Sequence, residues 1–409
     1  MKYIALLREP YIRWPLLFAF IGRIPLYVVN LALVLWAVKG GSYVISGLLV
    51  GVFNVGGAIG GVVTAGMADR KGASRTLAVT GVVQCVCLVL LGTVGLRAVA
   101  LAMVLVFAAG FATPPISSVI RNYWSSLPEA HVDPAYAVES VVGELLSIVG
   151  PLVLSAVLVF SDSAQALVVS GFLVLIGSVL LGMTNGIREF TVPREGSEGT
   201  AKRTLHDTLV QSLRMFRNKG FTGLVVRRML EAVSNGAFDV AIPAFAIWLG
   251  SEVYSGSLYS ALGVGSILGG LVYGLRKWRM PKEQIYCWGL LLSAIGMALP
   301  LLAFNYLSMS VALAIGALSF APVVAVEYSL ISRTSSVSHR SQGFAWMTTA
   351  GVAGSAIGSQ AAGIVTTYWG WRATFGVAAA VAFIAALLAW PMRRYWKEAK
   401  GQTDESSIG

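Results

Sequence analysis

Residues 77–95, LAVTGVVQCVCLVLLGTVG, form a stretch without a charged side chain. A helix needs about 20 predominantly apolar residues to cross a bilayer core that is ~30 Å thick. Blocks of the same kind recur along the whole chain, separated by polar segments. Because the apolar residues in these blocks are continuous rather than alternating, the blocks predict membrane-spanning helices.

The composition agrees with a protein whose surface mostly faces lipid. The 409-residue chain is 56% hydrophobic and only 12% charged, and its mean hydropathy is +0.75. Soluble proteins carry about 25% charged residues. The net charge of +11 comes from basic residues between the apolar blocks, where they would meet anionic lipid headgroups. We therefore expect a lipid bilayer as a partner and no nucleic acid.

Twelve spans are predicted, and most connections between them are short. The long connection at 186–219 separates a six-helix bundle at 1–185 from a second bundle at 220–392, which a cytoplasmic tail at 393–409 follows. The predicted spans are 14–36, 43–67, 77–95, 98–120, 135–159, 165–185, 220–248, 256–275, 284–304, 306–329, 342–366 and 371–391.

The middle connection has two parts of different character. Residues 192–203 are polar and contain glycine. In the part that follows, Leu205, Leu209 and Leu213 share one helical face. This pattern indicates a short amphipathic helix on the cytoplasmic headgroups, or else a solvated linker.

Lys and Arg residues are distributed unequally between the two sides of the predicted bundles. One side receives only Lys39, Arg97 and Arg372. Cytoplasmic loops are enriched in Lys and Arg, so both termini are expected inside, in a bacterial inner membrane. The basic residues on the expected cytoplasmic side include Arg8, Arg13, Arg70, Lys71, Arg75, Arg121, Arg276, Lys277, Arg279, Lys282, Arg393 and Arg394.

The two halves of the chain match at a nearly constant offset. A shift of 208 positions places Pro114 on Pro322, and a shift of 209 places Gly60 on Gly269. Small residues that recur in this way suggest duplication of a six-helix unit. A chain built from two parallel repeats is expected to bind its substrate near the midplane, where the halves meet.

A loop motif lies between the second and third predicted spans. Residues 65–75, AGMADRKGASR, resemble the loop signature of the major facilitator superfamily, although Ala65 stands where the family usually has Gly and the last basic residue is displaced by one. Gly72 is expected to permit a tight turn, and Asp69 to accept backbone N–H groups at a helix start. Arg70 and Arg75 would hold the loop at the membrane surface. In the family this loop stabilises the outward-open state.

The resemblance extends over residues 10–392 and implies a fold. It implies an all-α membrane protein with twelve transmembrane helices in two pseudo-symmetric six-helix bundles, working by alternating access. Thr113-Pro114-Pro115 and Ala135-Tyr136-Ala137 are similar to segments of a large bacterial group of efflux-type permeases.

A second motif, in the fifth predicted span, bears on the direction of transport. Gly143 and Gly150-Pro151 partly match the Gly-rich antiporter motif of exporters in the superfamily. The alternative is that these small residues only let helices approach closely. The Arg that many drug/proton antiporters carry four residues before a Gly in the fourth span is replaced here by Val106, so that proton relay is not expected intact.

Prolines occur in the four spans that line the central cavity in the superfamily. Proline bends a helix because it lacks an N–H donor, which could assist alternating access or merely shape the cavity. These prolines are Pro25, Pro114, Pro115, Pro243 and Pro322.

Several ionisable residues fall within the predicted spans, where each costs ~2.5–3.5 kcal/mol and normally has a partner. Arg227 and Arg228 are expected to snorkel to the inner surface. Glu139 and Glu327 lie near cytoplasmic ends, where they could form gate pairs. The deeper candidates are Arg23, Glu144, Glu231 and Asp239.

Roles for the deeper charges follow as hypotheses. Arg23 is the expected cavity cation, paired with Glu144 or Glu231. Asp239 is the first choice for a proton carrier, because a low-dielectric site raises the pKa of a carboxylate toward neutrality; Glu144 and Glu231 are the other candidates. A permanent structural salt bridge is the alternative. The remaining candidates for the cavity and substrate are Tyr27, Asn30, Asn235, Phe238 and Glu327.

The preferred function is proton-coupled export of a small amphiphilic molecule, a drug or a metabolite. Import of an organic anion, sugar or nucleoside by the same fold is the first alternative, and a membrane receptor or scaffold that transports nothing is the second. No nucleophile–base pair, phosphate-binding loop or metal-ligand pattern is evident, so we expect no enzyme, cofactor or metal. A proton gradient is the expected energy source, with sodium left open, and a monomer should contain the whole pathway.

Overall fold

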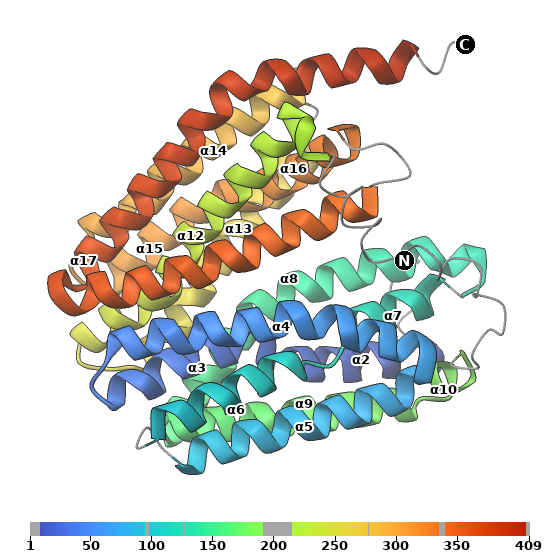
Figure 1. The fold of residues 1–409 in the computed structure, drawn as a ribbon, viewed down its shortest axis with the longest axis vertical. Coiled ribbons are helices and arrows are strands. Elements are labelled where there is room, and N and C mark those ends of the chain that lie inside the picture. Colours follow the sequence, from blue (N-terminus) through green and yellow to red (C-terminus); the bar gives the residue numbers. More distant parts are fainter. Residues whose placement is uncertain are drawn as a thin grey trace. The chain divides into compact units, whose positions relative to one another are not determined.

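A computed structural model describes residues 9–94, 98–125, 127–190, 215–276, 278–334 and 340–405, and Figure 1 shows its helices. All regular secondary structure within these ranges is helical, which confirms the all-α prediction. Helices are the expected solution, because a helix satisfies its backbone hydrogen bonds internally where no water is present. The amphipathic helix predicted at 204–217 lies mostly outside the described residues.

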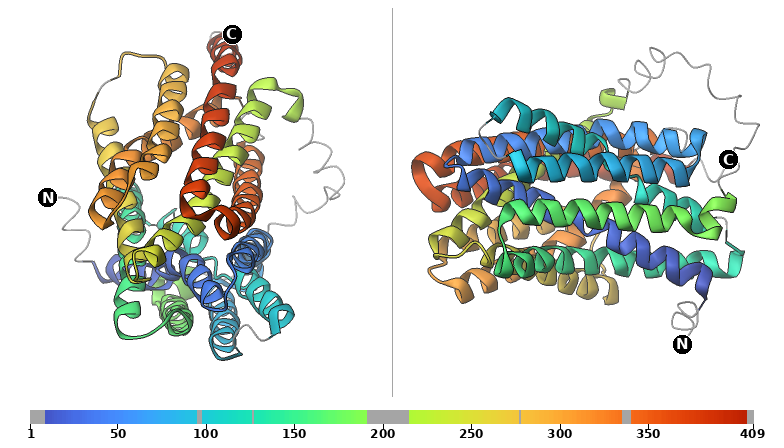
Figure 2. Two further views of the ribbon diagram at one scale, coloured as in Figure 1. Left: turned by 90° about the vertical axis from the view of Figure 1, so that its left-hand side faces the viewer. Right: turned by 90° about the horizontal axis from the view of Figure 1, so that it is seen from below.

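The described helices fall into two compact units. The first contains the helices from α2 to α10 together with residues Gly250–Ser260, and within it α5 packs against α9 and α4 against α6 (Figures 1 and 2). Its helices are α2 (Pro10–Arg23), α3 (Pro25–Lys39), α4 (Tyr43–Lys71), α5 (Ala73–Val94), α6 (Val99–Phe111), α7 (Ile116–Ser125), α8 (Glu129–Phe160), α9 (Ser163–Met183) and α10 (Asn185–Phe190).

The second unit contains the helices from α12 onward, apart from the first residues of α13. Here α17 packs against both α12 and α14. The elements are η3 (Met215–Arg217), α12 (Lys219–Trp248), α13 (Tyr254–Leu275), α14 (Lys282–Ala298), η4 (Leu299–Leu302), α15 (Tyr306–Gly316), η5 (Ala317–Ser319), α16 (Phe320–Thr334) and α17 (Arg340–Glu405).

The described residues contain 11 segments that are long and apolar enough to cross a membrane. The last of them, Trp346–Trp396, is 51 residues long, more than twice what one crossing needs. Gly370 interrupts it with φ 77° and ψ 176°, a backbone conformation that glycine adopts without strain. Because Gly370 divides this segment into two, the described chain has the twelve predicted spans.

Glycines at corresponding positions make corresponding close approaches in the two units. In the first unit, a Cβ atom added at Gly56 or Gly60 would overlap the carbonyl oxygen of Phe107 or Phe111. In the second unit, a Cβ atom at Gly265 or Gly269 would overlap the carbonyl oxygen of Ala314 or Leu318. Small residues of this kind let helix backbones meet directly in a membrane. The structures of the two halves therefore support the repeat seen in the sequence.

Gly60 and its neighbour Gly61 offer a matched test of this packing. We expect Gly60→Ala to lower the free energy of unfolding by about 1–3 kcal/mol, because the methyl group forces α4 away from Phe111. Gly61→Ala should be neutral, since nothing lies within 4 Å of an added Cβ there. Unfolding of both variants in detergent measures the difference, and equal stability of the two would contradict the proposed contact.

Candidate functional site

Arg23 forms the centre of a buried charged cluster in the first unit. It is the last residue of α2, and α3 begins two residues later at Pro25. Proline lacks the N–H group that would continue the backbone hydrogen bonds of the helix. Only 5% of Arg23 is exposed. Its Nη1 atom lies 3.4 Å from Oε1 of Glu139, and Nε of Arg121 lies 3.5 Å from the same oxygen. Two guanidinium groups thus share one carboxylate, which gives the cluster a formal charge of +1.

The Arg23–Glu139 pair is incompletely satisfied. Strong arginine–carboxylate pairs make two parallel hydrogen bonds, whereas this pair makes one long contact. Among the described residues, neither Nη2 of Arg23 nor Oε2 of Glu139 has a hydrogen-bond partner, although both atoms are buried. An unpaired buried polar atom is costly, so each side chain of this pair keeps one buried hydrogen-bonding position that no described residue fills.

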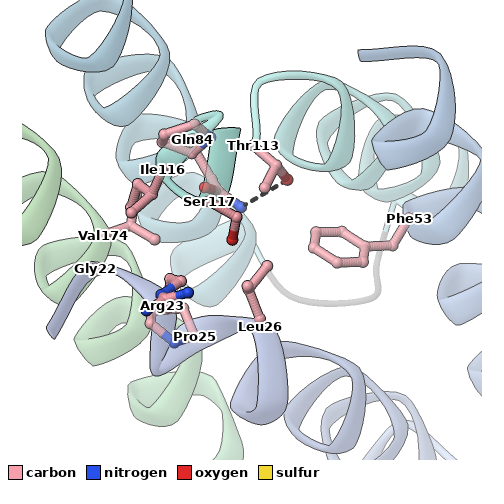
Figure 3. Close-up of a pocket in the computed structure, with 11 residues that line it drawn as sticks. Gly22, Arg23, Pro25, Leu26, Phe53, Gln84, Thr113, Ile116, Ser117 and Val174 are labelled. Carbon is pink, nitrogen blue, oxygen red and sulfur yellow. Dashed lines mark hydrogen bonds between the residues drawn. The ribbon is translucent and has the colours of Figure 1, made fainter. Parts of the chain in front are cut away.

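A small cavity with a partly polar lining adjoins Arg23 (Figure 3). Its volume is about 20 Å³, which is room for about one water molecule. Nε2 of Gln84 donates a hydrogen bond of 3.4 Å to Oγ1 of Thr113, and Oε1 of Gln84 has no partner among the described residues. The polar lining is Arg23, Gln84, Thr113 and Ser117; the apolar lining is Gly22, Pro25, Leu26, Phe53, Pro114, Ile116 and Val174.

The second unit holds a separate charged network, in which Arg227 and Glu327 are fully buried and Arg228 and Glu231 are half-buried. Arg227 is 1% exposed, and so is Glu327. Nη1 of Arg227 lies 2.7 Å from Oε2 of Glu231, Nη2 pairs with Oε1 of Glu327, and the guanidinium group sits 4.9 Å from the centre of the Tyr286 ring. Arg228 contacts Glu231 at 3.4 Å. Two cations therefore balance two carboxylates.

Two expectations about these charges are wrong. Arg227 does not snorkel to a surface, because two carboxylates hold it inside the unit. Arg23 pairs with Glu139 rather than with Glu144 or Glu231. Five residues along a helix correspond to a rotation of about 140°, so Glu144 faces away from the Glu139 side of α8 and its side chain is exposed. Glu231 is bound to Arg227 and Arg228.

Tyr27 and Asn30 follow Arg23 on α3. Tyr27 is 36% exposed, and its Cβ atom would be 2.6 Å from a Cβ atom added at Gly150. Gly150 thus lets α8 approach α3 closely, whereas Gly143 has nothing within 4 Å. Nδ2 of Asn30 lies 3.4 Å from Oδ1 of Asn54 on α4.

The candidates on α12 separate onto two faces. Asn235 and Asp239 are one helical turn apart and both are half-buried, so they share a face. Phe238 is 4% exposed, and its ring packs edge-on against Phe375 of α17 at 4.9 Å. Asp239 makes a polar or electrostatic contact. The structure therefore assigns Phe238 to the packing of α12 on α17.

The loop motif occupies the end of α4 and the start of α5. Gly72 has φ 97°, which matches the tight turn expected of it. Asp69 lies in the last turn of α4 rather than at a helix start, because α4 continues to Lys71. Ala65 is also within α4, and Arg70 and Arg75 are exposed on either side of the turn.

Most of the predicted bending prolines coincide with breaks in helices. Pro25 begins α3, Pro114 and Pro115 lie in the non-helical segment between α6 and α7, and Pro322 is in the first turn of α16 after η5. Pro243 is an exception, because α12 continues through it. Pro151 likewise lies within α8.

Sequence reasoning missed the polar lining of the cavity. Gln84 is the one carboxamide in the apolar stretch 77–95, and polar residues inside a span are rarely placed without a partner. That signal could have identified Gln84 as a site residue. The described residues contain no group of three His, Cys, Asp or Glu side chains placed to hold a metal ion.

Comparison with known proteins agrees with this architecture. Residues 228–406 match the family model described as Major Facilitator Superfamily. A mutant of the nucleoside transporter NupG superposes with a TM-score of 0.77 at 12% identity, covering 93% of this chain and 99% of that one.

Two further solved structures show the same fold. One is a bacterial homolog to human lysosomal transporter Spinster, inward-facing and occupied, with TM-score 0.75, 13% identity, and 96% and 98% of the two chains covered. The other is a mutant of the peptide transporter POT, with TM-score 0.73, 16% identity, and 94% of each chain covered. A search of curated proteins finds no match to the sequence.

Proposed function

We propose that this chain is a transporter of the major facilitator superfamily, whose family model matches residues 228–406, and that it exports a small amphiphilic molecule in exchange for protons. The observation that carries proton coupling is the set of carboxylates inside the spans, with Asp239 half-buried on α12 and Glu139 buried on α8. Ionisable groups are costly within a membrane and mark ion and proton pathways. Export is supported by Gly150 and Pro151, which match part of the antiporter motif.

The charge of the substrate decides whether substrate and proton move in opposite directions or together. A cationic group and a proton compete for one carboxylate, so a carrier that loads them alternately exchanges one for the other. Asp239 is the proposed carboxylate, with Asn235 on the same face as a hydrogen-bonding neighbour. Inward proton flow then drives the substrate out.

Import of an organic anion is the second candidate, and the Arg23 cluster favours it. An anion can take the place of Glu139 at Arg23 once Glu139 is protonated, because the cluster has a formal charge of +1 and the Nη2 atom of Arg23 has no partner among the described residues. Substrate and proton then bind together and move in the same direction. This arrangement is a symporter rather than an exchanger.

Everted membrane vesicles distinguish the two candidates. Vesicles from cells that express the protein are energised by respiration and offered fluorescent lipophilic cations and organic anions. Accumulation of a cation that stops when an uncoupler is added supports export. Accumulation of an anion by intact cells, with none in everted vesicles, would replace export with import.

Arg23 and Arg121 provide a test of the anion candidate, because both contact the same oxygen of Glu139. If an anion is carried, Arg23→Gln should reduce its transport at least about tenfold, since a buried charge interacts by several kcal/mol. Arg121→Gln should change transport little, because 66% of the Arg121 side chain is exposed and exposed pairs contribute about 0–1 kcal/mol. Equal effects of the two substitutions would exclude Arg23 as the anion site.

A further inference from the structure

The second unit has a large apolar groove beside α14. Its volume is about 760 Å³, within the range of roughly 300–1,000 Å³ that ligand pockets occupy. α14 contributes Ile285, Trp288, Leu292 and Ile295 to the wall, and Leu299 follows at the start of η4. These residues recur every three or four positions and therefore form one stripe along the helix.

Two glycines of α14 line the groove where this helix packs against its neighbours. A Cβ atom added at Gly289 would lie 2.7 Å from Cγ2 of Val323, and one added at Gly296 would overlap the carbonyl oxygen of Gly316. Neighbouring side chains leave the groove uncovered: 58% of Leu292 and 59% of Val272, on α13, are exposed. In a membrane-spanning unit, an open apolar surface of this kind faces lipid tails rather than water.

The dimensions of the groove suit a lipid chain. At 1.5 Å per residue, the stripe from Ile285 to Leu299 extends about 21 Å. One leaflet of the bilayer core is about 15 Å thick, half of the whole. A fatty acyl chain can therefore lie along the groove from the membrane surface past the midplane.

One end of the groove carries positive charge. Trp278 closes this end, with its indole N–H donating to the carbonyl of Tyr273 at 2.9 Å and the guanidinium group of Arg276 5.1 Å from its ring centre. Arg276, Arg279 and Lys282 are exposed, and none of them forms an ion pair with a described acidic side chain. A tryptophan flanked by arginines is typical of the membrane–water interface.

We propose that this groove binds an anionic phospholipid, with an acyl chain along α14 and the phosphate at Arg276 and Arg279. The apolar wall selects a lipid tail, and the basic rim selects an anionic headgroup over a zwitterionic one. The rim belongs to the side on which Lys and Arg residues concentrate, so the lipid comes from the leaflet on that side. The site is independent of the transported substrate.

Native mass spectrometry of the purified full-length protein tests the site. The protein is titrated with phosphatidylglycerol and with phosphatidylcholine that has the same acyl chains. We expect tighter binding of phosphatidylglycerol. Each basic residue contributes roughly fivefold at an anionic surface, so Arg276→Gln combined with Arg279→Gln should weaken phosphatidylglycerol binding roughly 25-fold. Phosphatidylcholine has the same phosphate but no net charge, so its binding should weaken much less.

Two further variants separate the groove from general surface effects. Leu292→Trp fills the groove without removing charge and should weaken both lipids. Arg394→Gln is the matched control, because Arg394 is also an exposed arginine of the second unit that lies over an aromatic ring, that of Tyr395 at 4.9 Å, but it is on α17 rather than next to Trp278. Equal binding of the two lipids by the unaltered protein would overturn the proposal. So would a dimer in which cross-linking places a second copy of the chain over Leu292.

Discussion

Replacing Glu327 with glutamine is expected to lower the free energy of unfolding by about 3–5 kcal/mol. Arg227 is 1% exposed and forms ion pairs with Glu327 and Glu231. Arg228 also forms an ion pair with Glu231. Removing the Glu327 charge leaves Arg227 and Arg228 to share Glu231, so one positive charge in the network is no longer neutralised. The glutamine keeps the volume, so no cavity contributes. Unfolding in detergent, followed by tryptophan fluorescence, measures the change.

A double variant distinguishes charge balance from the loss of one contact. Arg227→Met combined with Glu327→Leu removes a cation and an anion together, and it should recover most of the stability lost in Glu327→Gln, because buried ion pairs can often be replaced by apolar residues. Glu144→Gln serves as the control. Glu144 is exposed, so its substitution should stay within about 0.5 kcal/mol. A double variant no more stable than the single one would refute the proposed balance.

Replacing Asp239 with asparagine is expected to reduce proton-driven transport to the level of liposomes without protein. Asparagine keeps the shape of the side chain and its hydrogen-bonding capacity but cannot take up and release a proton. Binding of the substrate should persist, and so should exchange of labelled for unlabelled substrate in the absence of a proton gradient. Flux measurements with and without an imposed gradient separate these activities.

Asn235 provides the control for Asp239 because it lies one turn earlier on the same half-buried face of α12 and cannot titrate. Asn235→Ala should retain proton coupling even if substrate binding weakens. Transport by Asp239→Asn that still follows the proton gradient would remove Asp239 as the carrier. Loss of coupling in both variants would indicate that this face of α12 positions the substrate rather than the proton.

The fold was predictable because membrane insertion leaves a simple pattern in a sequence. Uninterrupted apolar stretches, such as 77–95, mark spans directly, since the bilayer admits few alternatives to a helix. Gly370 illustrates the strength of local signals, because a glycine between two apolar stretches marks the turn that divides α17. The repeat was also visible, because the close contacts at Gly60 and Gly269 tolerate no side chain.

The partners of the buried charges were harder to predict. Glu139 and Glu144 are both acidic residues on α8, and only the rotation of the helix decides that Glu139 faces Arg23. An offset of 208 aligned Arg23 with Glu231, but a repeat relates equivalent positions and does not place them in contact. Arg227 was expected to reach the membrane surface because of its distance from Trp248 along the span. Its partner Glu327 is 100 residues away in the sequence, and no local pattern connects the two.

Proton movement in reconstituted liposomes tests the central claim most directly. The purified protein is placed in liposomes that contain a pH-sensitive dye, a proton gradient is imposed, and lipophilic cations, organic anions and sugars are added in turn. We expect one class of compound to trigger proton flux through the unaltered protein, an amphiphilic cation to do so most strongly, and Asp239→Asn to abolish the response. A substrate that crosses the membrane without moving protons, through protein shown to be folded, would contradict proton coupling.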